Sequence, residues 1–364
     1  MPLVYFGSGS RRDRFVPHTT GAWAVFQDVL RQCEGESMQT HDRIFVAGHR
    51  GLVGSALVRR LRELGYQNLL LRTHGELELR DIPAVRRFFA TERPSHVFGA
   101  AARVGGILAN GTSPADFIHD NLLVQLSVLE AARAASVAKL VFLGSSCIYP
   151  RSAAQPIREE SLLTGELEPT NEAYAIAKIA GIVMCRSYNR QHGTRFISLM
   201  PTNLFGQGDN FRRTESHVLP ALIRRMHDAK IKQEDEVVVW GTGAPRREFL
   251  HVDDMADASI HLMRVWGEPA ADGSIVGGPD AVNEIVNVGY GDDISIAALA
   301  ELIRDVVGFT GRLRFDASKP DGMPRKLLDS TRLNATGWRP SISLRDGVER
   351  TYAWFLANHA EARL

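Results

Sequence analysis

The sequence predicts an α/β protein with a doubly wound parallel sheet and a smaller C-terminal α/β domain. From residue 43 onward, short apolar runs alternate with longer segments in which apolar residues recur at helical spacing. Such alternation is typical of parallel strands joined by crossover helices. The first apolar run also ends in a cluster of glycines that opens a helix, which marks where the sheet begins.

Each element follows from its own pattern. The predicted strands of the main sheet are 43–47, 68–72, 96–100, 139–143 and 195–199. The helices between them are predicted near 52–64, 82–91, 115–135 and 172–192. After Pro201 the order loosens into a helix near 216–229, a strand at 236–240, a helix at 253–265, a surface loop at 267–279 and a strand at 285–288 that rejoins the sheet. We therefore expect an N-terminal extension at 1–40, a sheet domain at 41–205 and a mainly ligand-binding domain at 206–364.

Three glycines, Gly48, Gly51 and Gly54, separate the first strand from the first helix. After a strand and before a helix, such glycines serve a tight turn, close approach of a pyrophosphate and close helix packing. The spacing is G-x-x-G-x-x-G rather than G-x-G-x-x-G, and a bare glycine triplet is more often only a turn. The strand–turn–helix context favours a dinucleotide-binding Rossmann domain.

The end of the second strand bears on which dinucleotide binds. An NAD site usually has an acidic residue there for the ribose 2′-hydroxyl, whereas this chain has Arg72 and only a late acid, Glu76. A guanidinium can bind a 2′-phosphate through charge-assisted hydrogen bonds. The sequence therefore favours NADP(H), with the alternative that Arg72 caps a surface loop.

Tyr174 and Lys178 lie four residues apart, so a helix places both on one face. A nearby ammonium favours the phenolate, and we expect the pKa of this tyrosine to be lowered. Such a tyrosine can protonate a carbonyl oxygen as a hydride arrives. A tyrosine packed on the core beside a solvated lysine is the ordinary alternative.

Together with Ser145, at the end of the strand 139–143, these features resemble the extended short-chain dehydrogenase/reductase family. Within that family the chain is similar to the epimerase-reductases that act on GDP-4-keto-6-deoxy-D-mannose. The segments that carry this similarity are 46–61, 101–110, 144–150, 167–182, 201–211, 216–227 and 237–254. The resemblance implies a GDP-sugar substrate, an NADP(H) cofactor and a homodimer formed by the helices 115–135 and 172–192.

The resemblance also implies a chemistry for this site. Ser145 and Tyr174 would stabilise the enolate of a 4-keto sugar, as in an oxyanion hole. Cys147, which we expect to point the same way in an extended segment, would be the base once a nearby cation favours its thiolate. His217 matches the acid on the opposite face. Without the resemblance, a lone cysteine at a strand end is most often a small apolar residue.

Further contacts are placed by resemblance. Those to the cofactor are expected at Gly48, His49, Arg50, Gly51, Leu52, Val53, Gly54, Arg72, His74, Leu143, Gly144, Ser145, Ser146, Lys178, Pro201, Thr202, Asn203, Leu204 and His217. Those to the substrate are expected at Arg225, Trp240, Arg247 and Asp321, with Lys326 as a weaker candidate. His74 stands where the family often has a stronger base, which would loosen selection against NADH. The ordinary alternative for Trp240 is a strand aromatic in the core.

Composition excludes several other classes of function. The net charge of +1 gives no broad basic surface for nucleic acid. No apolar run approaches the roughly 20 residues that span a bilayer. Three cysteines make no disulfide framework and suggest a reducing cytoplasm, with Cys33 and Cys185 structural. No metal site is expected. The helix entry near 251–254 is expected to be capped by aspartate, so His251 is not a catalytic candidate.

Two other readings compete with an epimerase-reductase. Another nucleotide-sugar enzyme of the same fold, a 4-epimerase or a 4,6-dehydratase, would share the tyrosine and lysine. Similar dehydratases carry Asp-Glu where this chain has Ser146 and Cys147, which counts against that reading. A non-catalytic NADP-binding protein would have no need to keep Ser145, Tyr174 and Lys178 together.

Overall fold

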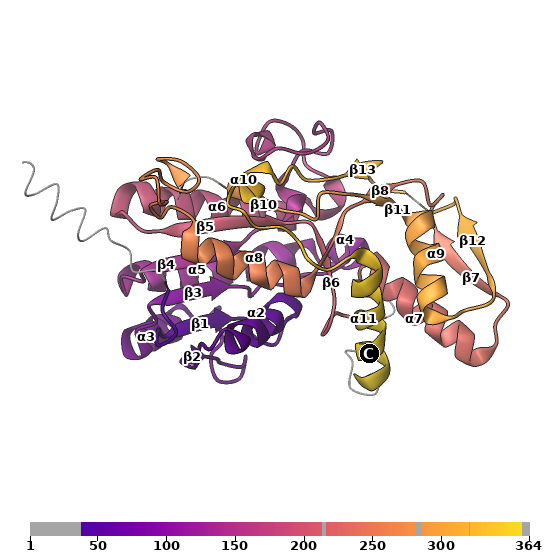
Figure 1. Ribbon diagram of the computed structural model, residues 1–364, viewed down its shortest axis with the longest axis horizontal. Coiled ribbons are helices and arrows are strands. Elements are labelled where there is room, and N and C mark those ends of the chain that lie inside the picture. Colours follow the sequence, from indigo (N-terminus) through magenta and orange to yellow (C-terminus); the bar gives the residue numbers. More distant parts are fainter. Residues whose placement is uncertain (1–37, 213–215, 282–284, 320, 359–364) are drawn as a thin grey trace, which may run out of the picture. The chain divides into compact units, whose positions relative to one another are not determined.

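A computed structural model describes residues 38–212, 216–281, 285–319 and 321–358. The described residues form one compact unit. The predicted extension at 1–40, including Cys33, lies almost wholly outside the described residues. The order of helices and strands along the described chain can be followed in Figure 1.

A six-stranded sheet forms the centre of this unit. Its strands are β1 (Ile44–Ala47), β2 (Leu69–Leu70), β3 (His96–Gly99), β4 (Lys139–Leu143), β5 (Phe196–Pro201) and β10 (Ile285–Val288). The spatial order is β10-β5-β4-β3-β1-β2, and every neighbouring pair is parallel. The predicted doubly wound parallel sheet is confirmed, including the return of the late strand. β2 is shorter than predicted because it is an edge strand that pairs only with β1.

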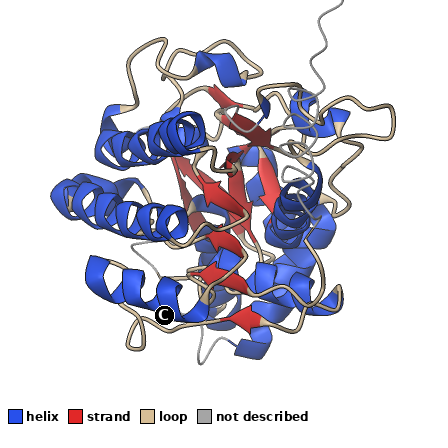
Figure 2. Cartoon of the chain, turned by 90° about the vertical axis from the view of Figure 1, so that its left-hand side faces the viewer, coloured by secondary structure: helices blue, strands red, loops and turns tan. Residues whose placement is uncertain are grey.

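Helices cover both faces of the sheet, as Figure 2 shows. One face carries α2 (Leu52–Glu63) and α8 (Val252–Val265), which pack together in one buried apolar cluster. The other carries α3 (Ile82–Glu92), α5 (Pro114–Ala134) and α6 (Glu172–His192) in a second cluster. Fully buried strands such as β1 follow from this arrangement, since parallel sheets are covered on both sides.

The second half of the chain builds a third apolar cluster. Its helices are α7 (Val218–Lys232), α9 (Ile296–Val307) and α11 (Leu344–Asn358), and the short helices α4 (Ile107–Thr112) and α10 (Thr331–Ala335) lie elsewhere. Three small sheets pair β7 (Glu236–Trp240) with β12 (Arg312–Asp316), β6 (Asn203–Phe205) with β9 (Phe249–His251), and β8 (Arg246–Arg247) with both β11 (Ile294–Ser295) and β13 (Arg325–Lys326). These pairings join segments distant in sequence, so periodicity alone did not predict them.

The start of α8 differs from the prediction of an aspartate cap. The His251 ring is the cap, since its Nδ1 accepts a hydrogen bond from the Asp253 N–H at 3.2 Å. Asp253 is instead paired with Arg59 at 2.6 Å. Asp254 turns the other way and accepts from the Ile342 N–H at 3.0 Å, which ties the C-terminal segment to α8.

No helix among the described residues is long and apolar enough to cross a membrane. Within the same residues, no group of three or more histidine, cysteine, aspartate or glutamate side chains is arranged to hold a metal ion.

Candidate active site

The glycine turn after β1 is packed too closely for any other residue at two positions. Gly48 has φ +78°, and a Cβ there would lie 2.8 Å from the Ala101 Cα, in the loop after β3. A Cβ on Gly54 would lie 2.1 Å from the Gly48 carbonyl oxygen, so α2 sits directly on the turn. The tight turn and the close helix packing expected of these glycines are therefore both present.

The N-terminus of α2 is open to an anion. Gly51 is its N-cap, no side chain caps this helix start, and its first turn holds no acidic residue. The first N–H groups of a helix lack intrahelical partners and attract phosphate. The strand order also reverses at this point: β2 lies on one side of β1 and β3 on the other. Open α/β sheets bind ligands where the strand order reverses in this way. This cradle fits a dinucleotide pyrophosphate.

The end of β2 comes close to the glycine turn. The pKa of His49 is lowered by burial and by the Arg50 charge, and its ring bonds the Arg72 backbone. Arg72 points its guanidinium at Glu92 at 2.7 Å and lies 5.3 Å from the Phe88 ring centroid. A 2′-phosphate would therefore have to share Arg72 with Glu92.

Two other residues of this segment also have protein partners. His74 is exposed and its Nε2 lies 2.7 Å from Glu78 Oε2. Glu76 accepts from the Thr73 N–H at 2.7 Å, and this backbone bond is the main cause that lowers the pKa of Glu76. The acid thus folds back on its own loop, as expected of a residue that comes too late to meet the ribose.

Ser145, Tyr174 and Lys178 meet at the carboxyl end of β4. The Lys178 ammonium is buried, donates to the Leu143 carbonyl at 2.8 Å, and lies 5.9 Å from the centroid of the Tyr174 ring. Burial lowers the pKa of Lys178 to about 8. The Phe117 ring packs edge-on against Tyr174 with centroids 6.4 Å apart, a contact that the sequence did not indicate.

The predicted lowering of the Tyr174 pKa is wrong in this structure. Burial raises the pKa of Tyr174 and the charge of Cys147 adds to the rise, while a hydrogen bond with Ser145 opposes it. The Lys178 ammonium does not offset the burial because it is directed at a backbone carbonyl. A phenol with a raised pKa stays protonated, which suits a proton donor better than a base.

Cys147 does not lie in the extended segment that we predicted. Residues Ser146–Ile148 form a 3₁₀ turn, and the Ser145 hydroxyl accepts from the Cys147 N–H at 3.2 Å. The chain bends here because this serine side chain caps the turn. The thiol still lies near Tyr174, as its electrostatic effect on the phenol requires.

Lys326 is the cation that approaches this cysteine. Its Nζ lies 3.7 Å from the Cys147 Sγ and donates to it. An ammonium at this range stabilises the negative charge that a sulfur acquires on losing its proton. The sequence suggested Lys326 only as a weak substrate contact. Its place beside Cys147 depends on a fold contact across 179 positions, for which the sequence carries no local signal.

His217 also interacts with Lys326, through the charge of the ammonium. It is the N-cap residue of α7, and part of its surface is open to solvent while the rest is covered by protein. Desolvation by the surrounding protein and then the Lys326 charge lower the pKa of His217. The thiol of Cys147, the Lys326 ammonium and the His217 imidazole thus form one group, drawn from the turn after β4, from β13 and from the residue that caps α7.

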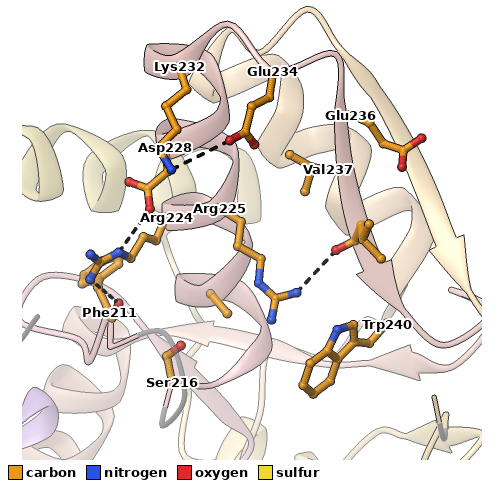
Figure 3. Close-up of a pocket in the computed structure, with 12 residues that line it drawn as sticks. Phe211, Ser216, Arg224, Arg225, Asp228, Lys232, Glu234, Glu236, Val237 and Trp240 are labelled. Carbon is orange, nitrogen blue, oxygen red and sulfur yellow. Dashed lines mark hydrogen bonds and ion pairs between the residues drawn. The ribbon is translucent and has the colours of Figure 1, made fainter.

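Two of the predicted substrate residues, Arg225 and Trp240, face each other at an open cavity. The Arg225 guanidinium lies 5.2 Å and the Lys319 ammonium 5.6 Å from the centroid of the Trp240 ring, which is 56% exposed. Arg225 and Trp240 line a cavity of about 430 Å³ that also includes Ser216. Figure 3 shows Arg225 reaching from α7 toward the strand that carries Trp240. Trp240 is therefore not the core aromatic of the alternative reading.

Arg247 and Asp321 are neighbours in the same region. Burial lowers the pKa of Arg247, and the Asp321 carboxylate opposes this shift. Asp321 accepts from the Thr242 N–H and hydroxyl, each at 2.7 Å, which fixes the carboxylate above the loop after β7. Arg225, Trp240, Arg247 and Asp321 therefore lie in one part of the fold.

This arrangement defines a class of protein. A glycine turn shaped for a pyrophosphate and a serine, tyrosine and lysine at the same edge of a parallel sheet are the parts of a dinucleotide-dependent enzyme that acts on a carbonyl or alcohol carbon. The model of the NAD dependent epimerase/dehydratase family matches residues 44–289. The chain belongs to this family.

Known relatives indicate which enzymes within this family the chain is similar to. The chain is 58% identical over 316 residues to putative GDP-L-fucose synthase 2 of Arabidopsis thaliana, covering 87% of this chain and 92% of that protein. It is 55% identical over 321 residues to GDP-L-fucose synthase of Escherichia coli (strain K12), covering 88% and 98%. A solved structure of a GDP-L-fucose synthetase from Naegleria fowleri bound to NADP aligns with a TM-score of 0.80 and 28% identity, covering 90% and 98%.

Proposed function

We propose that this enzyme converts GDP-4-keto-6-deoxy-D-mannose to GDP-L-fucose by inverting C3 and C5 and then reducing the C4 ketone with NADPH. The observation that carries the proposal is the cysteine beside the reducing group: Cys147 lies near Tyr174 and in contact with the Lys326 ammonium. A reductase alone needs only the serine, tyrosine and lysine. A thiol that a cation can activate adds the base that carbon inversion requires. The names of the relatives at 55–58% identity support the same reaction.

NADP(H) is the cofactor, as the solved relative with bound NADP supports. The N–H groups of the turn Gly48–Gly54 would hold its pyrophosphate, and Arg50 and Arg72 would offer their charges to the 2′-phosphate. Leu143–Ser146, Pro201–Leu204, Lys178 and His217 would line the nicotinamide side. When bound, NADPH supplies the hydride for C4.

In the epimerisation, each inversion is a proton transfer on carbon. Tyr174 and Ser145 donate hydrogen bonds to the C4 oxygen, so the negative charge of the enolate forms on an oxygen that already has donors. The Cys147 thiolate removes the proton next to the carbonyl, and the Lys326 ammonium stabilises the thiolate before that step. His217 delivers a proton to the opposite face. The same pair can act at C3 and C5, since both carbons flank one carbonyl.

In the reduction, Tyr174 is the acid. Its raised pKa keeps the phenol protonated until the C4 oxygen gains charge, when it transfers its proton. Lys178 holds the site in place through the Leu143 carbonyl. Since Tyr174 serves both stages, the epimerised ketone need not leave before it is reduced.

The remaining contacts fit a GDP-sugar. Arg225 and Arg247 would hold the diphosphate, because a guanidinium binds phosphate oxygens in pairs. Trp240 offers an exposed face for stacking and Asp321 an acceptor for the base or sugar. We place these residues in a substrate domain at 206–364, and its apolar cluster, which begins at Phe205, supports that division.

We also propose a homodimer through α5 and α6, which pack against each other on one face of the sheet. Three large apolar side chains remain exposed on these helices: Leu126 at 39%, Ile176 at 41% and Val183 at 45%. A second copy of the chain that covered these side chains would extend the apolar contact between α5 and α6. The catalytic cysteine must stay reduced, which favours the cytoplasm as the place of work.

The test is NADPH consumption with a panel of nucleotide 4-keto sugars, with the configuration of each product determined by NMR. We expect the highest kcat/KM for GDP-4-keto-6-deoxy-D-mannose and inversion at C3 and C5 in its product. Reduction at C4 with both neighbouring centres unchanged would identify a simple 4-reductase and contradict the proposal.

A further inference from the structure

Glu248 is a buried carboxylate to which the mechanism above gives no role. It lies between β8 and β9 and has no exposed surface. Its carboxylate accepts from the backbone N–H groups of Gly291 at 2.8 Å and Leu328 at 3.1 Å. The Tyr290 N–H and the Thr202 hydroxyl are further partners. All of these partners are uncharged and belong to segments remote in sequence. Burying a carboxylate is costly, and desolvation raises the pKa of Glu248.

The backbone of Glu248 makes further connections. Its N–H donates to the Lys326 carbonyl at 3.2 Å. Its carbonyl accepts from the Thr202 hydroxyl at 3.2 Å and from the Asn203 amide at 2.8 Å. Glu248 therefore joins the segment after β5, the loop after β10 and the strand β13. Two of these segments belong to the proposed cofactor and cysteine sites.

The position of Lys326 depends on such connections. Its strand, β13, has only two residues, and the register with β8 sets Lys326 opposite Arg247. A strand this short has few hydrogen bonds of its own. The Gln155 side chain accepts from the Leu327 N–H at 2.8 Å. The segment that carries the Lys326 ammonium is thus held by Glu248 at Lys326 and Leu328 and by Gln155 at Leu327.

The charged and titratable groups around the Cys147 thiol come from three elements. Lys326 on β13 contacts the sulfur, Tyr174 on α6 interacts with it electrostatically, and His217 at the start of α7 faces the same lysine. Of these, Lys326 is the cation in contact. A displacement of β13 therefore changes the stability of the thiolate more directly than it changes the phenol or the imidazole.

We propose that Glu248 is a positioning residue for the proposed epimerisation: through Leu328 and the Lys326 backbone it holds β13 so that the Lys326 ammonium stays against Cys147. The inference rests on the proposed function for its consequence in catalysis. Its structural part, the control of the thiol by a remote carboxylate, can be tested without substrate.

The variant is Glu248→Gln, which keeps the shape but turns an NH₂ group toward a backbone N–H. We expect the midpoint of the pH profile of Cys147 alkylation by iodoacetamide, followed on the Cys147 peptide by mass spectrometry, to rise by about half a unit to one unit. Solvent deuterium exchange at C3 and C5 should fall roughly 3- to 10-fold at pH 7 and recover at higher pH. The Kd for NADPH should stay within about twofold.

Asp254→Asn is the matched control. Asp254 is also a buried carboxylate with backbone N–H partners, at Ser341 and Ile342, but it belongs to α8 and the C-terminal segment. Its substitution should lower the melting temperature and leave the alkylation profile unchanged. Lys326→Met completes the design, because Glu248→Gln should add no further shift once the ammonium is gone.

Gln155→Met provides a second variant should Glu248→Gln fail to fold, with a smaller upward shift expected. The inference is overturned if the folded variant lowers the melting temperature as Asp254→Asn does but leaves the midpoint of Cys147 alkylation at the wild-type pH. It is also overturned if Glu248→Gln shifts the midpoint equally with and without Lys326. The proposed function fails separately, if wild-type enzyme does not exchange the sugar protons at all.

Discussion

The glycine turn and the cysteine site lie at the same end of one parallel sheet but are built in opposite ways. The turn is local: Gly48 and Gly54 are six positions apart, and their close packing is fixed by their own segment and one neighbouring loop. The cysteine site is assembled from Cys147, His217 and Lys326, which three separate elements bring together. In the proposed mechanism, cofactor binding therefore depends on local geometry, whereas carbon inversion depends on the register of remote segments.

The largest expected effect concerns Tyr174, the group that the proposed mechanism uses in both chemical stages. Tyr174→Phe keeps the ring against Phe117 but removes the proton donor, so C4 reduction should fall by about 10²–10⁴. Stopped-flow absorbance of NADPH measures the step. The Kd for NADPH serves as the control and should change little. Reduction at the wild-type rate would mean that another group supplies the proton to the C4 oxygen.

Lys326→Met tests the cysteine site without changing the glycine turn. Loss of the ammonium should slow deuterium exchange at C3 and C5 by about 10- to 100-fold near pH 7, because the thiolate loses its contact cation. NMR of substrate incubated with enzyme and NADP⁺ in D₂O measures it. Reduction of a ketone supplied already epimerised should be much less affected. An equal loss in both reactions would mean that Lys326 serves substrate binding rather than the cysteine.

Whereas Lys326→Met should slow proton exchange on the sugar, Gly54→Ala should weaken cofactor binding. Its Cβ would meet the Gly48 carbonyl at 2.1 Å, so the turn must move and NADPH binding should weaken, with a stability loss of about 1–3 kcal/mol. Gly75→Ala is the matched control, since nothing lies within 4 Å of a Cβ there. Calorimetry and NADPH titration measure both variants. Equal behaviour of the two would show that the turn tolerates a side chain.

The smallest effect is a pH dependence of stability from Lys178. Burial lowers its pKa to about 8 from about 10.5 unfolded, so folding is opposed wherever the unfolded chain binds the extra proton. Stability therefore rises as pH increases through this window, by about 1 kcal/mol between pH 8 and pH 9. Urea unfolding of the wild type and of Lys178→Met, compared at each pH, isolates the contribution of Lys178 to the free energy of unfolding. A difference that stays flat across this window would show that the ammonium is not desolvated.

The fold and the local half of the site were predictable from the sequence. The periodicity of apolar residues predicted the strands and helices of the sheet. The turn at Gly48 was predicted from its position directly after an apolar run. The bend at Cys147 was missed because a hydrogen bond from its own N–H to Ser145 overrides the extended strand. The direction of the Tyr174 pKa was missed for a different reason. Spacing shows that Lys178 is near, but not that its ammonium faces the Leu143 carbonyl.

The contact of Lys326 with Cys147 and the role of Glu248 could not be predicted in the same way. Both arise from the pairing of the two-residue strands β8 and β13, which have no periodic pattern to recognise. The resemblance suggested Lys326 only as a weaker candidate for a substrate contact. Only the register of the small sheet shows that its ammonium faces a sulfur.

The most direct test of the account is deuterium incorporation with and without the thiol. Wild-type enzyme, GDP-4-keto-6-deoxy-D-mannose and NADP⁺ are incubated in D₂O, and NMR follows the protons at C3 and C5. The account predicts exchange at both carbons in wild type and loss of most of it in Cys147→Ser, because a hydroxyl in that position is too weak a base. NADPH binding should be retained in the variant. Exchange of both protons by Cys147→Ser at the wild-type rate would show that Cys147 only fills space and would contradict the mechanism.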